Sequence, residues 1–470
     1  MNIILKQTDK IPCEHPINYV YEEVPSLTKD DYKCRTKKLF SMPQAADYDY
    51  IVIYGDREHF SNIQYFTGYD PRWEETLLLL HREKKPLLLV ANEGIGYVKA
   101  APAEMDIAMY QNFGLMGQPN DSRSKKLIDI FKDYGITLSD QIGLIGWKTY
   151  REDLFELNTL VTDVPHYIVE TLAQVADINK IKNAVDLMAD CEYGLKHKVS
   201  AKEIVIFEHQ GTRVSRGIYN CIKNVKPGMT ETEAGELLGL DGEPLNMHPN
   251  LNFGDEHVRV GLNSPKFDRR LKLGDAFGAG YGAPGCLVHK CGMYIRDEKD
   301  LPEEKKDYVD SFLKPYFACV VKWYEMMKIG AKCGDIYQMV EDELGFDKFG
   351  IGLNPGHLSH TDEWTNSPFY KDSLIKIHSG MMFQCDFTVN FQKPFMSAHI
   401  EDGLAIADEE LQKQVQELSP TCWKRICARK KFMQEELNIE LPQEVLPLSD
   451  LCGVCFPYMA DTSVVLAKAK

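Results

Sequence analysis

The most informative segment of the sequence is Ser379-Gly380-Met381-Met382-Phe383-Gln384-Cys385-Asp386, followed by Ile400-Glu401-Asp402. Upstream, Gly274-Asp275 begins a strand-like segment. Gly356-His357 lies between that segment and Ser379. Carboxylates and a histidine are the side chains that bind divalent cations or transfer protons. The candidate functional site therefore lies between Gly274 and Glu401.

Length and composition limit the classes of protein to consider. The chain has 470 residues, enough for two domains, and its fractions of charged and apolar residues, 26% and 44%, are those of a soluble globular protein. Its formal net charge of −16 argues against a nucleic-acid partner or an anionic membrane. No apolar run reaches the ~18 residues that cross a bilayer.

The cellular location is expected to be the cytoplasm. The apolar run within the first ten residues is too short for a signal peptide, and Asp9 interrupts this segment. Thirteen cysteines are scattered along the chain, with one Cys-x-x-Cys at Cys452–Cys455. An odd number without an export signal indicates reduced thiols.

The first part of the chain alternates strand and helix signals, which predicts an α/β domain. Short apolar runs at 50–54, 76–80, 86–90 and 141–146 have the length of strands. Residues 125–134 have helical spacing and end at Gly135, a residue suited to ending a helix.

The second part begins with helical patterns. Apolar residues recur every three to four positions from Ile181 to Leu195, which predicts one buried helix face. Pro227-Gly228 then breaks the chain, and Thr230-x-x-Glu233 forms a capping box for the next helix. A further helical segment is expected over 302–344. We interpret the basic cluster between Lys424 and Lys431 as the solvated face of a helix.

In their order and spacing, these motifs resemble the creatinase, prolidase and Xaa-Pro aminopeptidase family. Residues 62–69 resemble its N-terminal domain, and Val225–Glu231 resembles its "pG-x-tE" junction. The resemblance implies an α/β (α+β) protein: a creatinase-like N-terminal α/β domain followed by a "pita-bread" catalytic domain, and a homodimer. We expect an N-terminal extension at 1–45, the two domains at 46–170 and 171–408, and a C-terminal extension at 409–470.

The family's fold holds two divalent cations with two Asp, one His and two Glu. The family motif "GD-x4-D" places the first Asp at the position of Gly280, and the second, eleven residues later, at Cys291. Glycine has no side chain, and cysteine offers a soft thiolate rather than a bridging carboxylate. His357, Asp386 and Glu401 match the other three positions, with Asp386 one methylene shorter than the usual Glu.

The resemblance therefore implies the following candidate residues. The metal ligands, if a metal binds, are Cys291, His357, Asp386 and Glu401. The catalytic candidates are His357, His360 and Glu401, and the substrate-binding candidates are His289, Asn263, Glu363 and Trp364. We expect no cofactor, the alternative being one divalent cation, Zn or Mn; without metal, His357, Asp386 and Glu401 would hydrogen-bond one another.

Three functions stay open at this point. The first is a divergent family member without the dinuclear centre, acting on a small peptide or amide-like substrate as a metal-independent hydrolase, as creatinase does, or binding a small molecule. The second is a metal-dependent Xaa-Pro aminopeptidase or dipeptidase with a rearranged site. The third is a dimeric scaffold without enzymatic activity.

Overall fold

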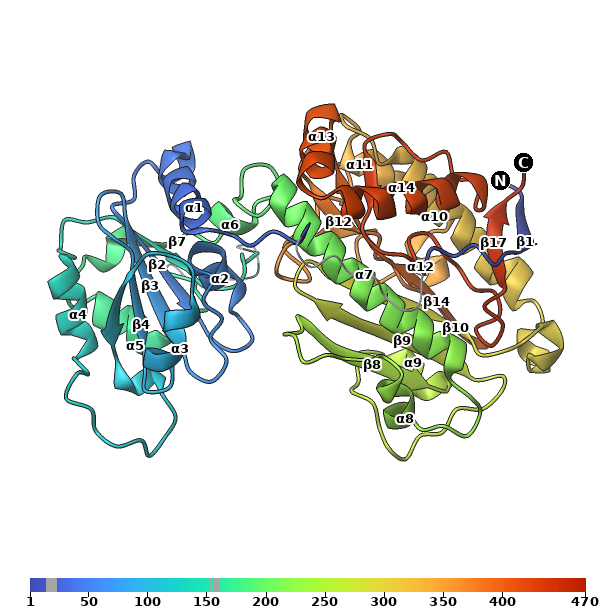
Figure 1. The fold of residues 1–470 in the computed structure, drawn as a ribbon, viewed down its shortest axis with the longest axis horizontal. Coiled ribbons are helices and arrows are strands. Elements are labelled where there is room, and N and C mark those ends of the chain that lie inside the picture. Colours follow the sequence, from blue (N-terminus) through green and yellow to red (C-terminus); the bar gives the residue numbers. More distant parts are fainter. Residues whose placement is uncertain (14–22, 152–153, 155–159) are drawn as a thin grey trace. The chain divides into compact units, whose positions relative to one another are not determined.

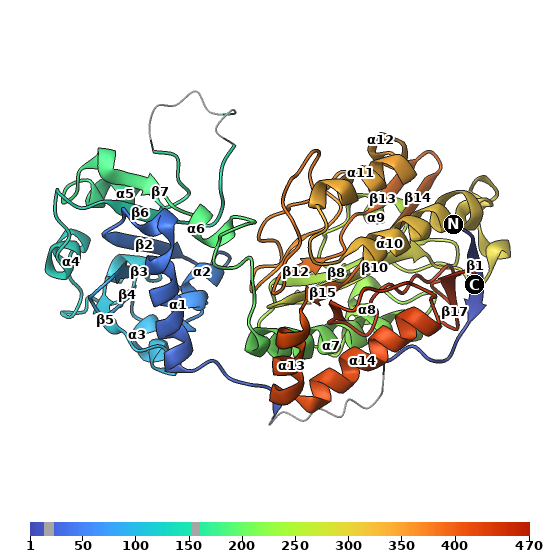
Figure 2. The same cartoon turned by 90° about the horizontal axis from the view of Figure 1, so that it is seen from above.

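The computed structural model describes residues 1–13, 23–151, 154 and 160–470, and the chain divides into two compact units (Figure 1). The N-terminal unit is Ser26–Leu195, and the C-terminal unit joins Met1–Pro25 to Lys196–Lys470. The two chain ends lie side by side (Figure 2) because β1 (Ile3–Gln7) pairs antiparallel with β17 (Val464–Lys468). The segment 1–45 is thus divided, with β1 in one unit and α1 (Lys29–Ser41) in the other.

The N-terminal unit is built on a six-stranded mixed sheet of order β5-β4-β3-β2-β6-β7. Its strands are β2 (Tyr50–Gly55), β3 (Thr76–His81), β4 (Leu87–Val90), β5 (Asp106–Met109), β6 (Ile142–Ile145) and β7 (Ile181–Asn183). Its main helices are α1, α2 (Ser61–Thr67), α4 (Leu127–Tyr134) and α5 (His166–Leu172). The expected strands and the helix before Gly135 are all present, so the α/β prediction is confirmed.

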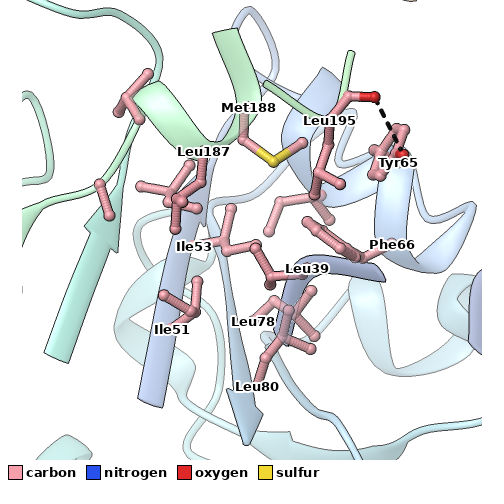
Figure 3. Close-up of a cluster of buried hydrophobic side chains, with 14 of the residues drawn as sticks. Leu39, Ile51, Ile53, Tyr65, Phe66, Leu78, Leu80, Leu187, Met188 and Leu195 are labelled. Atoms are coloured by element: carbon pink, nitrogen blue, oxygen red, sulfur yellow. Dashed lines mark hydrogen bonds between the residues drawn. The ribbon is translucent and has the colours of Figure 1, made fainter. Parts of the chain in front are cut away.

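The apolar strands of this sheet are buried on both faces. Ile51 and Ile53 of β2 join one hydrophobic cluster, together with Leu39 of α1 and Phe66 of α2 (Figure 3). Val52, which points to the opposite face, joins a second cluster that includes residues of α4 and α5. Because side chains alternate along a strand, a continuous apolar run is what a sheet covered on both faces requires.

The helix expected from Ile181 to Leu195 does not form as one element. Ile181–Asn183 is β7, which pairs parallel with β6, and only Asp186–Ala189 is helical, as the short α6. The apolar side chains are buried as expected, but they belong to a strand, a short helix and a loop rather than to one helix. The sheet consequently continues past residue 170, and the compact unit ends at Leu195.

The C-terminal unit contains a five-stranded sheet of order β13-β14-β10-β9-β8 and a four-stranded sheet of order β11-β12-β15-β16. The strands of the first are β8 (Met247–Phe253), β9 (Ala276–Ala283), β10 (Cys286–Met293), β13 (Val389–Gln392) and β14 (Phe395–Glu401). Those of the second are β11 (His357–Leu358), β12 (Met382–Gln384), β15 (Gly403–Ile406) and β16 (Val445–Pro447).

Helices pack against these sheets. The 24-residue α7 (Ala201–Asn224) contacts β9 and β10, and α8 (Glu231–Glu236) begins at the expected capping box of Thr230 and Glu233. The segment 302–344 forms η9 (Tyr308–Leu313), α10 (Lys314–Met326) and α11 (Cys333–Glu343), which confirms the helical prediction. In the part of the chain that the structure describes, no helix has the length and hydropathy needed to cross a membrane.

The basic cluster of α14 (Pro420–Glu435) is only partly solvated. Lys424 and Lys431 are exposed, but Arg429 is buried: it lies 2.6 Å from Glu208 of α7 and 2.7 Å from Asp450. The prediction of a solvated face is therefore wrong for Arg429. Through these ion pairs, the segment after residue 408 is fixed to the long helix of the C-terminal unit.

Replacing Arg429 with Ala should lower the free energy of unfolding by about 3–5 kcal/mol, because two buried carboxylates would lose their shared cation. Urea unfolding followed by tryptophan fluorescence measures this change. The matched control is Lys431→Ala, on the exposed side of the same helix, which should change stability by no more than about 0.5 kcal/mol. Equal effects of the two substitutions would contradict a buried network.

Candidate active site

Three predicted residues meet in the interior of the C-terminal unit. His357 lies in β11, Asp386 follows β12, and Glu401 ends β14. One ligand atom from each lies within 4.8 Å of the other two, and all three side chains are buried. Strands from two different sheets thus bring together residues that are up to 44 positions apart in the sequence.

The imidazole of His357 is held with one nitrogen facing carboxylates. Its Nδ1 lies 3.2 Å from the carbonyl oxygen of Leu358, and the ring of Trp364 stacks on it with 4.1 Å between ring centroids. Its Nε2 is 3.2 Å from Glu363 Oε1, 3.5 Å from Asp386 Oδ2 and 3.9 Å from Glu401 Oε1. This buried Nε2 thus faces three carboxylate oxygens, of which that of Glu363 is the nearest.

The buried carboxylates and histidines of the site shift one another's pKa values. Burial and the neighbouring charge of Asp386 raise the pKa of Glu401 to about 8. Burial alone would lower the pKa of His357, but the carboxylates, Glu363 first among them, hold it well above 6.5. Asp386 keeps a lowered pKa despite its burial, because it accepts a hydrogen bond from His399. Positive charge between these groups is therefore strongly favoured.

His399 is a site residue that the sequence analysis missed. Its Nε2 is 2.8 Å from Asp386 Oδ1, and its Nδ1 is 2.7 Å from Nδ1 of His289. The signal was present in Ala398-His399-Ile400-Glu401, since residues two apart on a strand share a face. Asp386, His399 and His289 form a hydrogen-bonded chain from the segment after β12, across β14, to β10.

His289 lies over the position where the family motif requires an acid. It is directly opposite Gly280 in the β9–β10 pair, and a Cβ placed on Gly280 would lie 2.4 Å from Cδ2 of His289. A carboxylate at position 280 would collide with this imidazole unless the ring moved. The glycine and the histidine are therefore sterically matched.

Cys291 is near this cluster in sequence but has a different partner. Its Sγ lies 3.4 Å from the hydroxyl of Ser397, and the group of converging metal-ligand atoms in the described chain does not include it. Burial raises the pKa of the Cys291 thiol to about 11, which favours the protonated form over a metal-binding thiolate.

The remaining candidates divide between the site and its surroundings. Glu363 and Trp364 contact His357, as described above. His360 turns to α7 instead, with its Nε2 3.1 Å from Oε1 of Glu203. Asn263 lies in the loop before β9, where its carbonyl oxygen accepts a 3.5 Å hydrogen bond from Asn252, and no contact with the three central residues is found in the described chain.

The residues fit one divalent cation. His357 Nε2, Asp386 Oδ2 and Glu401 Oε1 converge, and Glu363 Oε1 lies beside the same nitrogen. One imidazole with two carboxylates is a donor set that suits zinc or manganese. Position 280, where the resemblance implies a ligand of a second cation, supplies none, and the imidazole of His289 lies over it.

Solved structures of known proteins share this fold. The prolidase from Pyrococcus horikoshii matches with a TM-score of 0.59 and 17% identity, over 79% of this chain and 95% of its own. Recombinant prolidase from Thermococcus sibiricus gives 0.62 and 14%, over 82% and 96%. The X-Pro aminopeptidase from Thermotoga maritima gives 0.58 and 12%, over 80% and 95%.

No family model matches the sequence, and no curated protein matches it either. The likeness is therefore one of structure at low sequence identity. It confirms the predicted fold class: the chain has the two-domain, pita-bread architecture of the prolidases and X-Pro aminopeptidases.

Proposed function

We propose that this protein is a hydrolase of small peptide- or amide-like substrates that works with one divalent cation held by His357, Asp386 and Glu401. The observation that carries the proposal is the buried convergence of His357, Asp386 and Glu401, whose ligand atoms lie within 4.8 Å of one another. A bound cation would accept the nitrogen lone pair of His357 and offset the negative charge of the two buried carboxylates. The fold shared with prolidases and an X-Pro aminopeptidase makes Xaa-Pro peptides the first substrates to test.

The side chains around His357 have distinct roles in this proposal. A cation held there would polarise a carbonyl oxygen and acidify a water molecule. Glu363, whose side chain is 25% exposed, is placed to accept the proton of that water. Trp364 fixes the plane of the His357 ring by stacking, and His399 fixes Asp386 through its hydrogen bond.

Metal-independent hydrolysis is the second candidate. It is favoured by the pKa of about 8 at Glu401, because a carboxyl group that keeps its proton at neutral pH can act as a general acid. The pair of His399 and Asp386 would then orient the substrate or carry a proton. Both candidates need Glu401, but only the first needs a cation.

Metal content and activity should be measured together on the purified protein. We expect one equivalent of Mn²⁺ or Zn²⁺, with Xaa-Pro cleavage lost on chelation and regained on reloading. Glu401→Gln should lower kcat/KM on the order of a hundredfold or more, because it removes both a ligand and an ionisable group. The matched control is Glu409→Gln, on the exposed first turn of α13 (Glu409–Leu418), which should leave activity unchanged.

Two other results would contradict the proposal in different ways. Activity that resists chelation but still depends on Glu401 would establish the metal-independent candidate. Metal-free protein with no cleavage of any small peptide or amide would overturn both candidates and support the scaffold hypothesis.

Cation affinity should fall as the pH is lowered. Without a cation, His357 and Glu401 both retain protons near neutral pH, since the pKa of His357 is well above 6.5 and that of Glu401 is about 8. A cation must displace these protons, so affinity should drop by roughly tenfold per pH unit for each proton released below pH 8. Calorimetric titration in buffers of different ionisation enthalpy counts the protons, and a constant affinity from pH 6 to 8 would contradict this linkage.

We also propose that the chain is a cytoplasmic homodimer. The thirteen cysteines, all free thiols, support a reducing compartment. Sedimentation equilibrium should give twice the mass of the 53.7 kDa chain. A single species of the monomer mass at micromolar concentration would exclude a stable dimer.

A further inference from the structure

The two buried carboxylates of the site each face two histidines. Asp386 presents Oδ2 to Nε2 of His357 at 3.5 Å and Oδ1 to Nε2 of His399 at 2.8 Å. Glu401 presents Oε1 to His357 at 3.9 Å and Oε2 to His399 at 3.9 Å. One oxygen of each carboxylate is thus directed to each histidine.

This arrangement is the one that bridging carboxylates adopt between two cations. In a two-metal site each bridging group gives one oxygen to each ion, and the shared negative charge offsets the repulsion between the ions. Here the oxygens on the side of His357 converge with its Nε2, as a cation site requires. The oxygens on the other side converge on an N–H donor, Nε2 of His399.

His399 is in turn fixed from behind by His289. The two Nδ1 atoms are 2.7 Å apart, a hydrogen bond that needs one proton between them. His289 can hold this position because position 280 is glycine. The imidazole of His289 also lies close to Gly278: a Cβ added to Gly278 would be 3.5 Å from Nε2 of His289. Both glycines belong to β9, and because neither has a side chain, the imidazole of His289 can lie over this strand.

We propose that His399 takes the place of a second cation, and that His289, lying over Gly280, holds it there, so that the site accepts one ion only. This inference rests on the proposed single-cation function and extends it to two residues outside the ligand set. His399 and His289 are then positioning residues: they act on the substrate only through Asp386 and Glu401. The losses at positions 280 and 291 are compensated by histidines on neighbouring strands.

Removing His399 should open the second position. In His399→Ala, Asp386 Oδ1, Glu401 Oε2 and the freed Nδ1 of His289 would face the vacated space, and these three donors suit a cation. Titration with Mn²⁺ alone, followed by elemental analysis and electron paramagnetic resonance, should give one equivalent for the wild type. His399→Ala should bind a second equivalent, with the spin–spin coupling of two neighbouring Mn²⁺ ions.

Two further variants make this test specific. The double variant His289→Ala/His399→Ala lacks the third donor and should return to one equivalent. Ser397→Ala, on the same face of β14 but touching neither carboxylate, should bind one equivalent, as the wild type does. A wild type that binds two equivalents, or a His399→Ala protein that binds no additional ion, would overturn the inference.

A measurement on the metal-free protein separates this inference from the proposed function. Selective ¹⁵N labelling of histidine should reveal a scalar coupling between Nδ1 of His289 and Nδ1 of His399, across their hydrogen bond. The coupling should vanish in His289→Ala. Its absence from the wild type would overturn the placement of His399, whereas a wild type that shows the coupling but binds no Mn²⁺ would contradict only the proposed function.

Discussion

Two buried carboxylates, Asp386 and Glu401, share one small space, and the need for positive charge between them governs the rest of the site. Neither can remain ionised at low cost without a cation or a donor close by. His357 lies on one side of the pair and His399 on the other, and every other feature of the site supports one of these two rings. Trp364 stacks on the first, and His289 bonds to the second.

The fold positions these side chains by bringing together strands from distant parts of the chain. On β10, His289 faces the site, while the next residue, Lys290, points to the opposite face. There Lys290 forms a buried ion pair with Asp402, whose other oxygen accepts a 2.6 Å hydrogen bond from Ser449. The residues after 408 therefore support the strands of the site, although the sequence analysis treated them as an extension.

The candidate site was predictable in part, and the outcome differed from residue to residue. His357, Asp386 and Glu401 could be found because they stand in local motifs that resemble a known family. Gly280 was recognised as a lost ligand, but the imidazole that lies over it could not be foreseen, because the steric match depends on the pairing of β9 with β10. His399 stands two residues before Glu401 but belongs to none of the motifs that resemble the family, so those motifs could not identify it.

Local sequence patterns were enough to predict the alternating α/β unit, the helices between residues 302 and 344, and the order of the chemically active side chains. These follow from local apolar periodicity and from short motifs, which need no knowledge of distant contacts. Local patterns could not show that Ile181–Asn183 is a strand, that Arg429 is buried, or that His399 and His289 stand behind Asp386. Each of these depends on pairing or packing between segments far apart in the chain, where the partner rather than the local sequence sets the conformation and the charge.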